Sequence, residues 1–292
     1  MLTLQKHHCR DCRYPVCGKC SELRNNERHC KSQDNCDKRT HLTLQVMVKN
    51  GDDVRQDQMV MQMIRLMNKL LNNMNLDLCL SPYAVLAISS SQGMLEMVQN
   101  SKALSGVKSI RAFLKECAPT SNKEEINPQV MDTYIRSCAG YAVITYLLGI
   151  GDRHLDNIMI DDKGHFFHID FGYIFGQDPK VKEASIRITN DMIDGMGGKN
   201  SKNYQLFLGY AFQAYHILRQ NALLLITLLR LMLDANIKDC KPEFLDRMIA
   251  RFNLSMTDEE AESDFKRVLE GCIGDIFVGM LEIAHNIATA MR

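Results

Sequence analysis

The stretch that most constrains this chain runs from residue 149 to residue 179 and reads GIGDRHLDNIMIDDKGHFFHIDFGYIFGQDP. Asp152 precedes Asn157 by five positions, and Asp170 opens an Asp-Phe-Gly triplet further along. Between them, apolar runs flank the turn sequence Asp-Asp-Lys-Gly, which predicts a hairpin over residues 158–169 that returns Asp170 to Asn157. One amide and one carboxylate suffice to hold Mg2+ on nucleotide phosphates, so the stretch predicts metal-dependent phosphoryl transfer.

The composition fits a globular protein of one large domain or two ordinary ones. The chain has 292 residues and is 46% hydrophobic, which is enough to bury a substantial core. Its formal net charge is zero, so no global field favours nucleic acid, and we expect no nucleic-acid partner. No apolar run is long enough to span a membrane and the N-terminus lacks a secretory pattern, so we expect a cytoplasmic protein.

Six of the eleven cysteines crowd into residues 9–36, and this clustering indicates a metal site in a reducing compartment. Two Cys-x-x-Cys pairs lie close together there, and such pairs give thiolates the turn geometry that tetrahedral Zn2+ needs. The alternative is a cysteine-rich leader without structure. The candidate zinc ligands are Cys9, Cys12, Cys17, Cys20, Cys30 and Cys36.

The same segment resembles part of a FYVE zinc finger. The sequence KHHCRDC, residues 6–12, is similar to the basic core of that family, which binds the headgroup of phosphatidylinositol 3-phosphate. The resemblance implies that Lys6, His7, His8 and Arg10 contact the headgroup. Because the first ligand pair of the family has no counterpart here, we expect a partial finger over residues 1–37.

Residues 38–100 predict a small lobe rich in β-strands. Residues 38–48 alternate as a strand does, Lys49 ends that strand, and an amphipathic helix begins near Asp57. Kinase folds use a strand lysine and a helix acid in this order to anchor a cation on the nucleotide phosphates. Residues 76–101 read as strand, turn and strand, followed by a linker to the next lobe whose backbone can bind adenine. The linker residues are Glu96, Met97 and Val98.

Residues 101–292 predict a mainly helical second lobe. Helical patterns run from residue 110 to residue 148 and over most of the chain after residue 191, and Thr257 with Glu260 forms a capping box. The predicted later helices are 201–218, 222–236, 242–252 and 257–291. Together the segments predict an α+β, two-lobed fold like that of protein kinases, with the opening stretch between the lobes.

Five side chains can be given roles in phosphoryl transfer. Asn157 and Asp170 would hold the metal, Lys49 would contact phosphate, and Asp152 with His154 would handle the proton of the acceptor hydroxyl. Arg153 stands between that pair and completes the catalytic set. Each residue has an ordinary reading as a loop, turn or core side chain, but the ordered set favours the functional one.

The order Asp-Arg-His inverts the His-Arg-Asp order of ordinary protein kinases and is typical of phosphatidylinositol kinases and their giant protein-kinase relatives. Residues 40–292 resemble the catalytic domain of class III phosphatidylinositol 3-kinases. The motifs that carry the resemblance are KNGDDVRQDQ, MDTYIRSCAGYAVITYLLGIGDRHLDN, HIDFGYIFGQDPK, DMIDGMGG, LMLDANI and LSMTDEEA.

This resemblance implies an enzyme that uses ATP with Mg2+ or Mn2+ to phosphorylate the 3-hydroxyl of phosphatidylinositol in membranes. It implies that Tyr83 lines the nucleotide pocket, that regulatory protein subunits bind, and that the protein works peripherally on endosomal or autophagic membranes. The loop after Asp-Phe-Gly resembles that of enzymes acting on plain phosphatidylinositol.

Nothing before residue 38 resembles the first strands and phosphate loop of the family, so we expect a truncated small lobe. One alternative is therefore a catalytically impaired kinase-like membrane or scaffold protein. A second is a giant-family protein kinase, which the loop and the LMLDANI helix disfavour.

Overall fold

A computed structural model of the chain describes residues 2–3, 21–24, 27–30, 45–118, 125–177 and 186–272. In the cysteine-rich segment it describes the backbone of two short antiparallel strands, β2 (Ser21–Arg24) and β3 (Glu27–Cys30). The predicted zinc ligands and headgroup contacts therefore lie outside the described side chains. The same holds for residues 178–185, in the loop after Asp-Phe-Gly, and for residues 273–292.

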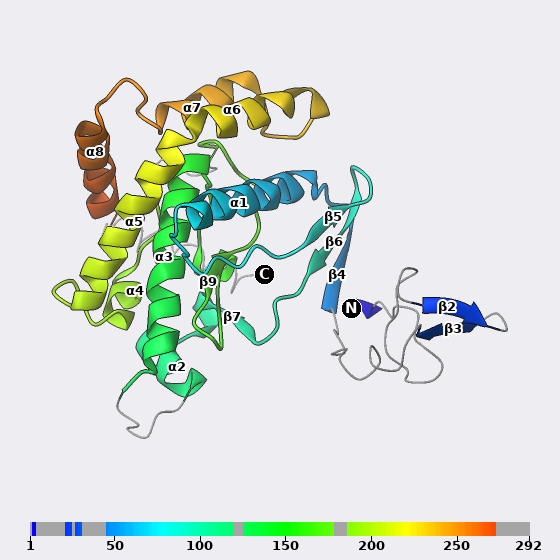
Figure 1. Cartoon of the computed structure of the whole chain (residues 1–292), viewed down its shortest axis with the longest axis horizontal. Coiled ribbons are helices and arrows are strands. Elements are labelled where there is room, and N and C mark those ends of the chain that lie inside the picture. The colour runs from blue at the N-terminus through cyan, green and yellow to red at the C-terminus, as the bar shows by residue number, and fades with distance from the viewer. Residues whose placement is uncertain are drawn as a thin grey trace, which may run out of the picture.

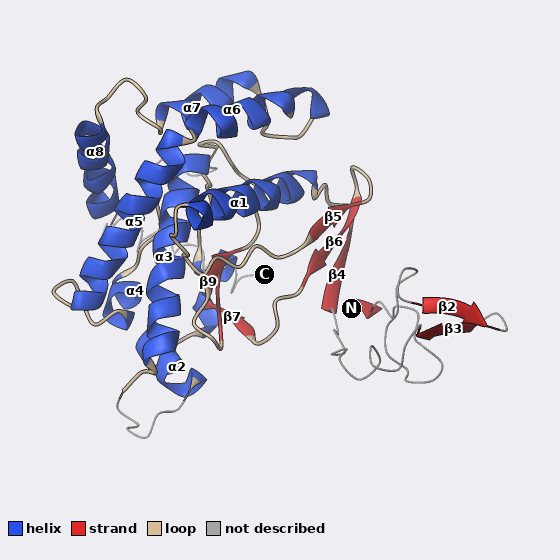
Figure 2. Cartoon of the chain, viewed as in Figure 1, coloured by secondary structure: helices blue, strands red, loops and turns tan. Residues whose placement is uncertain are grey.

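The architecture is α+β, as predicted. Helices gather on one side of the molecule, and the strands β4 to β6 stand beside them with α1 running between (Figures 1 and 2). A second, smaller sheet lies against the helical lobe. This arrangement is kinase-like, with a sheet-bearing lobe and a helical lobe.

The larger sheet has the strand order β1-β4-β6-β5 and is antiparallel throughout. Its strands are β1 (Leu2–Thr3), β4 (Gln45–Asn50), β5 (Val85–Ala87) and β6 (Gln92–Glu96). Strand β4 continues to Asn50, past the predicted end at residue 48, so Lys49 lies inside it and pairs with Gly93 of β6. Residues 38–44 are outside the described part.

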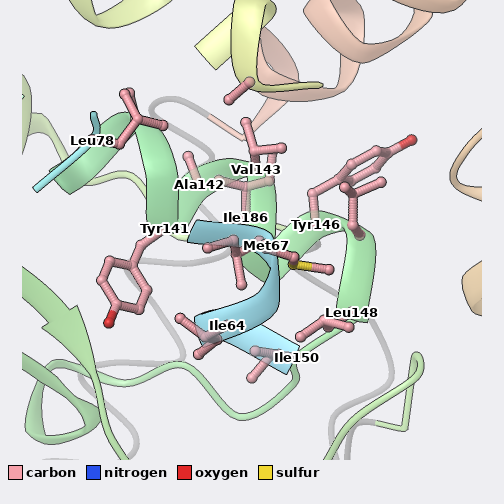
Figure 3. Packing of buried hydrophobic residues seen from close by; sticks show 14 of the residues in the cluster. Ile64, Met67, Leu78, Tyr141, Ala142, Val143, Tyr146, Leu148, Ile150 and Ile186 are labelled. Carbon is pink, nitrogen blue, oxygen red and sulfur yellow. The ribbon is translucent and has the colours of Figure 1, made fainter. Parts of the chain in front are cut away.

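Helix α1 (Arg55–Asn73) starts two residues before Asp57 and contacts both the larger sheet, at β5, and the helical lobe, at α5. Its predicted apolar stripe is confirmed, because Met59, Met63 and Met67 are buried. Burial continues to Leu71, after which the helix ends. In Figure 3, Ile64 and Met67 of α1 lie against residues of α3, so the middle of α1 packs on the helical core.

Helix α3 (Pro128–Leu148) is the centre of the helical lobe. Asn127 caps it by accepting the N–H of Gln129, and Pro128 occupies the first turn, where its missing N–H costs nothing. From Ser137 to Leu148 every residue is buried. Gly149 ends the helix at φ 55°, and a Cβ there would lie 2.5 Å from the nitrogen of Gly176, so glycine is required.

Shorter helices surround α3. They are α2 (Ile110–Cys117), α4 (Asn190–Gly195), α5 (Lys202–Gln220), α6 (Ala222–Leu231), α7 (Pro242–Ala250) and α8 (Asp258–Gly271). The predicted capping box is confirmed: Thr257 Oγ1 accepts the N–H of Glu260, and Glu260 Oε2 accepts the N–H of Thr257. Helix α8 ends at Gly271, so most of the remainder of the predicted final helix falls outside the described residues.

In the described part of the chain, 3-10 turns occur after β7, before β8 and after α6; they are η2 (Leu104–Gly106), η3 (Leu155–Asn157) and η4 (Leu233–Ala235). Within the described part of the chain, no single helix is long and apolar enough to cross a membrane. By length and composition alone, the pair Lys202–Gln220 and Ala222–Ala235 passes that test together, with a bend of 63° between its members.

The smaller sheet contains the hairpin that the sequence predicts. Its strands are β7 (Ser101–Ala103), β8 (Ile158–Asp161) and β9 (Phe166–His168), in that spatial order. Ile158 pairs with His168, and Asp161 closes the turn by accepting the N–H groups of Lys163 and His165. The hairpin therefore places the residues before and after it at the same end of the sheet.

Candidate active site

A cavity of about 300 Å3 lies between the larger sheet and the hairpin. We call it the interlobe cleft. Eight of the predicted nucleotide and metal residues line it: Lys49, Asp57, Tyr83, Glu96, Met97, Val98, Asn157 and Asp170. These residues come from β4, α1, the segment before β5, the end of β6, η3 and the segment after β9. The fold therefore gathers into one cleft residues that are spread over more than a hundred positions of sequence.

Asn157 and Asp170 face the cleft from the two ends of the hairpin. The N–H of Ile169 donates to the carbonyl of Asn157 at 3.0 Å, which fixes the two chain segments side by side. Asn157 Nδ2 donates to the carbonyl of Asp152 at 3.1 Å, so its Oδ1 is the amide atom left for a ligand. The Asp170 carboxylate accepts the N–H of Gly172 at 3.2 Å through Oδ1. One amide oxygen and one carboxylate form a hard oxygen donor set that fits Mg2+ or Mn2+.

The residues that line the cleft include no cysteine and no histidine. Over residues 45–118, 125–177 and 186–272, no group of three or more His, Cys, Asp and Glu side chains is placed to hold a metal ion. Thiolates and imidazoles are the donors that structural zinc sites use. The cleft is therefore suited to a cation that keeps several of its own waters.

Arg153 points away from the cleft into the backbone beneath it. The residue is 7% exposed, and its guanidinium donates to the carbonyls of Gly151 at 2.9 Å and Ile169 at 2.8 Å, and also to the carbonyl of Asp170. Burial lowers the pKa of Arg153 to about 10, and the nearby Asp170 and Asp152 carboxylates oppose that shift. The predicted catalytic Arg153 is thus placed as a positioning residue that holds the segment carrying Asp170.

Asp152 and His154 lie beside Asn157 at the edge of the site. Asp152 has φ 50°, an uncommon value outside glycine, which is typical of functional loops. His154 Nε2 is 3.9 Å from Asp152 Oδ2, and His154 Nδ1 is 3.6 Å from Asp156 Oδ2. The imidazole therefore sits between two carboxylates, of which the sequence predicted only Asp152.

The expected ion pair between Lys49 and Asp57 is not formed. Lys49 Nζ lies 3.4 Å from Asp52 Oδ2, in the turn that follows its strand. Asp57 is buried and accepts the N–H of Phe171 at 3.2 Å. Burial raises the pKa of Asp57, the negative charge of Asp170 adds to the shift, and the bond from Phe171 and the charge of Lys49 oppose it. The Asp57 carboxylate therefore binds the backbone of Phe171, whereas the Lys49 ammonium pairs with Asp52 in the exposed turn.

The predicted linker residues border the cleft where the chain leaves β6. The Glu96 carboxylate accepts the N–H of Ala84 at 2.7 Å, and the N–H of Met97 donates to the carbonyl of Gln45 at 2.8 Å. Ser101 Oγ donates to the carbonyl of Val98 at 2.8 Å. These bonds hold the linker rigid beside the cavity, as a planar ligand requires.

Tyr83 closes the back of the cleft. Its hydroxyl is buried and, among the described residues, has no hydrogen-bond partner. Burial raises the pKa of Tyr83 well above the usual value, and the Asp57 carboxylate contributes to the same shift. A buried hydroxyl at the wall of a cavity is available to a ligand or a water.

Sequence reasoning missed the apolar walls of the cleft. The sheet contributes Met47 and Leu95, which are cross-strand partners, and the hairpin contributes Met159 and Phe167, which are also partners. Ser101 and Ile169 complete the lining. Alternation could have identified Met47 two positions before Lys49, and Phe167 and Ile169 on one face of the hairpin. The walls suit a flat apolar ring, such as adenine.

Comparison with known proteins agrees with this geometry. The family described as "Phosphatidylinositol 3- and 4-kinase" matches residues 43–111 and 107–241. Phosphatidylinositol 3-kinase pik3 of Schizosaccharomyces pombe is 42% identical over 259 residues, covering 85% of this chain and 32% of that protein.

Two further relatives, both named phosphatidylinositol 3-kinase VPS34, show the same extent of similarity. The protein of Saccharomyces cerevisiae is 42% identical over 254 residues, which cover 85% of this chain and 29% of the relative. The protein of Arabidopsis thaliana is 41% identical over 254 residues, which cover 85% of this chain and 31% of the relative. This chain thus spans about a third of the length of these relatives. Because the family match covers more than half of its residues, the chain belongs to the phosphatidylinositol 3- and 4-kinase family.

Proposed function

We propose that this chain is an ATP-dependent lipid kinase that phosphorylates the 3-hydroxyl of phosphatidylinositol. The observation that carries the proposal is the interlobe cleft, in which Lys49, Asn157 and Asp170 meet beside an apolar slot. The names of the similar proteins supply the substrate and the position of the hydroxyl.

In the proposed reaction, the 3-hydroxyl oxygen of the lipid attacks the γ-phosphorus of ATP, and the bond to the β-γ bridging oxygen breaks to release ADP. Asp152 and His154 take the hydroxyl proton, for which the Asp152 carboxylate beside the imidazole is suited. The Lys49 side chain on β4 is 31% exposed, and its ammonium would leave Asp52 to contact phosphate oxygens.

We assign the divalent cation to Asn157 and Asp170, through Asn157 Oδ1 and the Asp170 carboxylate. Mg2+ or Mn2+ bound there would neutralise phosphate charge as it develops. Adenine would fill the slot between Met47, Phe167 and Ile169, with its edge on the backbone of Glu96, Met97 and Val98. Tyr83 would close the back of that slot.

The test is a lipid kinase assay on the whole chain with Mg-ATP and phosphatidylinositol vesicles, in which the 3-phosphate and 4-phosphate products are separated by chromatography. We expect the 3-phosphate, and Asp170→Ala should reduce it at least about 100-fold, because one metal ligand is lost. Asp194→Ala, which removes an exposed carboxylate on α4, is the matched control and should retain activity.

Folded, unmutated protein that yields no lipid product would refute the proposal and favour the nonenzymatic scaffold reading. A product that is only the 4-phosphate would keep the family and overturn the 3-hydroxyl assignment.

We also propose that the cysteine-rich segment binds zinc through its Cys-x-x-Cys pairs, by its resemblance to a FYVE finger. Metal analysis by mass spectrometry tests this, and less than about half an equivalent of zinc per chain would refute it.

By family resemblance we further propose regulatory protein subunits and a peripheral location on endosomal or autophagic membranes. Imaging of a fluorescent fusion beside an endosomal marker tests the location.

A further inference from the structure

The first turn of α1 holds both backbone polar groups of Phe171, the residue that follows Asp170. Gln56 Nε2 donates to the carbonyl of Phe171 at 2.8 Å, and Asp57 Oδ1 accepts its N–H at 3.2 Å. Gln56 is 4% exposed and Asp57 is 8% exposed, so these bonds are shielded from water. Two consecutive side chains thereby fix the peptide groups on both sides of Phe171, in the segment that carries the metal-binding carboxylate.

Asp239, in the connection between α6 and α7, continues the same network from the opposite side. Its side chain is buried, and Oδ2 accepts Gln56 Nε2 at 3.1 Å and the N–H of Ile174 at 3.3 Å. The N–H of Asp239 in turn donates to Gln56 Oε1 at 3.0 Å. Gln56 and Asp239 are therefore joined by two hydrogen bonds. Together they bind the backbone of residues 171–174 at the carbonyl of Phe171 and the N–H of Ile174. We call this pair the Gln56–Asp239 clamp.

The conformation of Asp170 explains why such a clamp is needed. Asp170 has φ 59°, in the left-handed region that non-glycine residues seldom adopt, and such a residue costs about 1–3 kcal/mol unless its surroundings hold it. Arg153 holds the carbonyls of Ile169 and Asp170 on one side. On the other side, the bonds to Phe171 and Ile174 fix the chain. The clamp thus adds to the restraint that Arg153 provides around the strained residue.

We propose that Gln56 and Asp239 are positioning residues that hold the Asp170 carboxylate toward the metal, and so couple the start of α1 and the α6–α7 connection to the active site. The inference rests on the proposed function for its metal and nucleotide. Gln56 and Asp239 do not line the cleft, so they act through the backbone of residues 171–174.

The first test needs no ligand. Hydrogen–deuterium exchange of the whole chain should show faster amide exchange over residues 171–174 in Gln56→Leu than in the unmutated protein, because the segment loses its restraint. Gln58→Leu is the matched control, because it makes the same change two residues further along α1. It removes the hydrogen bond that Gln58 accepts from the N–H of Ala87 in β5. Gln58→Leu should leave exchange over residues 171–174 unchanged.

The second test measures ATP binding with Mn2+ and in the presence of a chelator, by titration calorimetry. Gln56→Leu and Asp239→Leu should weaken Mn2+–ATP binding about 10- to 100-fold, as loss of a supporting hydrogen bond around a metal ligand does. Affinity for metal-free ATP should change by less than about twofold, since the slot for adenine is untouched. Asp239→Asn keeps an acceptor oxygen in place and should retain most of the Mn2+-dependent affinity.

Equal loss of Mn2+–ATP and metal-free ATP affinity, or equal effects of Gln56→Leu and Gln58→Leu, would overturn the clamp and leave a purely structural network. Failure of Asp239→Asn to differ from Asp239→Leu would also count against it. The two proposals fail separately. A chain that binds Mn2+–ATP but does not phosphorylate lipid refutes the proposed function, whereas the exchange experiment judges the clamp without nucleotide.

Discussion

At the scale of single residues, Arg153 holds the backbone on which the metal-binding side chains stand. Its guanidinium is a planar fork that satisfies backbone carbonyls on both segments that carry the metal-binding side chains. A lysine carries its donors on one nitrogen, which cannot reach all of the carbonyls that the guanidinium binds. The residue therefore contributes both to folding and to the geometry of the site.

We predict that Arg153→Lys lowers the free energy of unfolding by about 2–4 kcal/mol, because buried carbonyls lose their donors. Arg136→Lys is the control: Arg136 is more exposed on α3 and pairs with Asp132, so its replacement should change stability by less than about 1 kcal/mol. Urea denaturation followed by circular dichroism measures both. Equal losses in the two variants would contradict the role assigned to Arg153.

His168 makes the stability of the fold depend on pH. It is buried, stacks on Tyr141 with ring centroids 5.4 Å apart, and faces the Arg153 guanidinium, whose nearest atom lies 3.5 Å from Nδ1. Burial, followed by the charge of Arg153, lowers the pKa of His168 well below its usual value. As the pH falls, His168 therefore takes up a proton in the unfolded chain near the ordinary pKa of histidine, about 6.5, but remains neutral in the folded chain.

We predict that stability supported by neutral His168 is complete above about pH 6.5 and is lost as the pH falls below it. The slope for this one group is at most about 1.4 kcal/mol per pH unit. His168→Phe, which keeps an aromatic ring at the stack, should show a smaller loss of unfolding free energy between pH 7.5 and pH 5.5. Identical pH dependence in the two proteins would show that His168 does not contribute.

At the scale of elements, the packing of α1 on the sheet depends on Gly93. A Cβ at Gly93 would lie 2.1 Å from Val54 Cγ2 and 2.9 Å from the carbonyl of Leu86. Val54 is buried and directly precedes α1, which carries Gln56 and Asp57. The absence of a side chain at Gly93 thus sets how closely the start of α1 approaches β6.

We predict that Gly93→Ala destabilises the chain by about 1–3 kcal/mol through this overlap. It should also reduce lipid kinase activity, because α1 must shift. Gly209→Ala makes the same change within α5, where a Cβ would meet nothing within 4 Å, and should instead stabilise by about 0.5–1 kcal/mol. Chemical denaturation of both variants supplies the comparison, and destabilisation of similar size at both sites would be inconsistent with the close approach.

At the scale of the whole molecule, residues of both lobes line the cleft. A nucleotide bound there would contact both lobes and should therefore stabilise both against unfolding. We predict that Mg-ATP at about 100 times its dissociation constant adds about 2.7 kcal/mol to the free energy of unfolding. Asp170→Asn should gain less from the same Mg-ATP concentration, because a neutral amide replaces the metal-binding carboxylate. Thermal unfolding with and without Mg-ATP tests this, and equal gains in the two proteins would argue against Asp170 as a metal ligand.

Several local features of both lobes could be predicted from the sequence alone. The hairpin after Asn157, the capping box of Thr257 and the buried stripe of α1 were all predicted correctly. Each depends on residues close together in the sequence, where turn chemistry and periodicity fix the geometry. The strand near Lys49 continues to Asn50, past its predicted end at residue 48, because alternation alone marks the limits of a strand poorly.

The amino-acid sequence by itself determined the chemistry of this protein: an amide and a carboxylate at hairpin spacing, with a strand lysine upstream. Only the tertiary structure decided which partners these groups have. It bonded the Arg153 side chain to backbone carbonyls and paired Lys49 with Asp52. It also brought Gln56 into contact with Phe171, 115 positions away, and with Asp239, 183 positions away. Contacts over such separations depend on how whole elements pack, and local spacing carries no record of that packing.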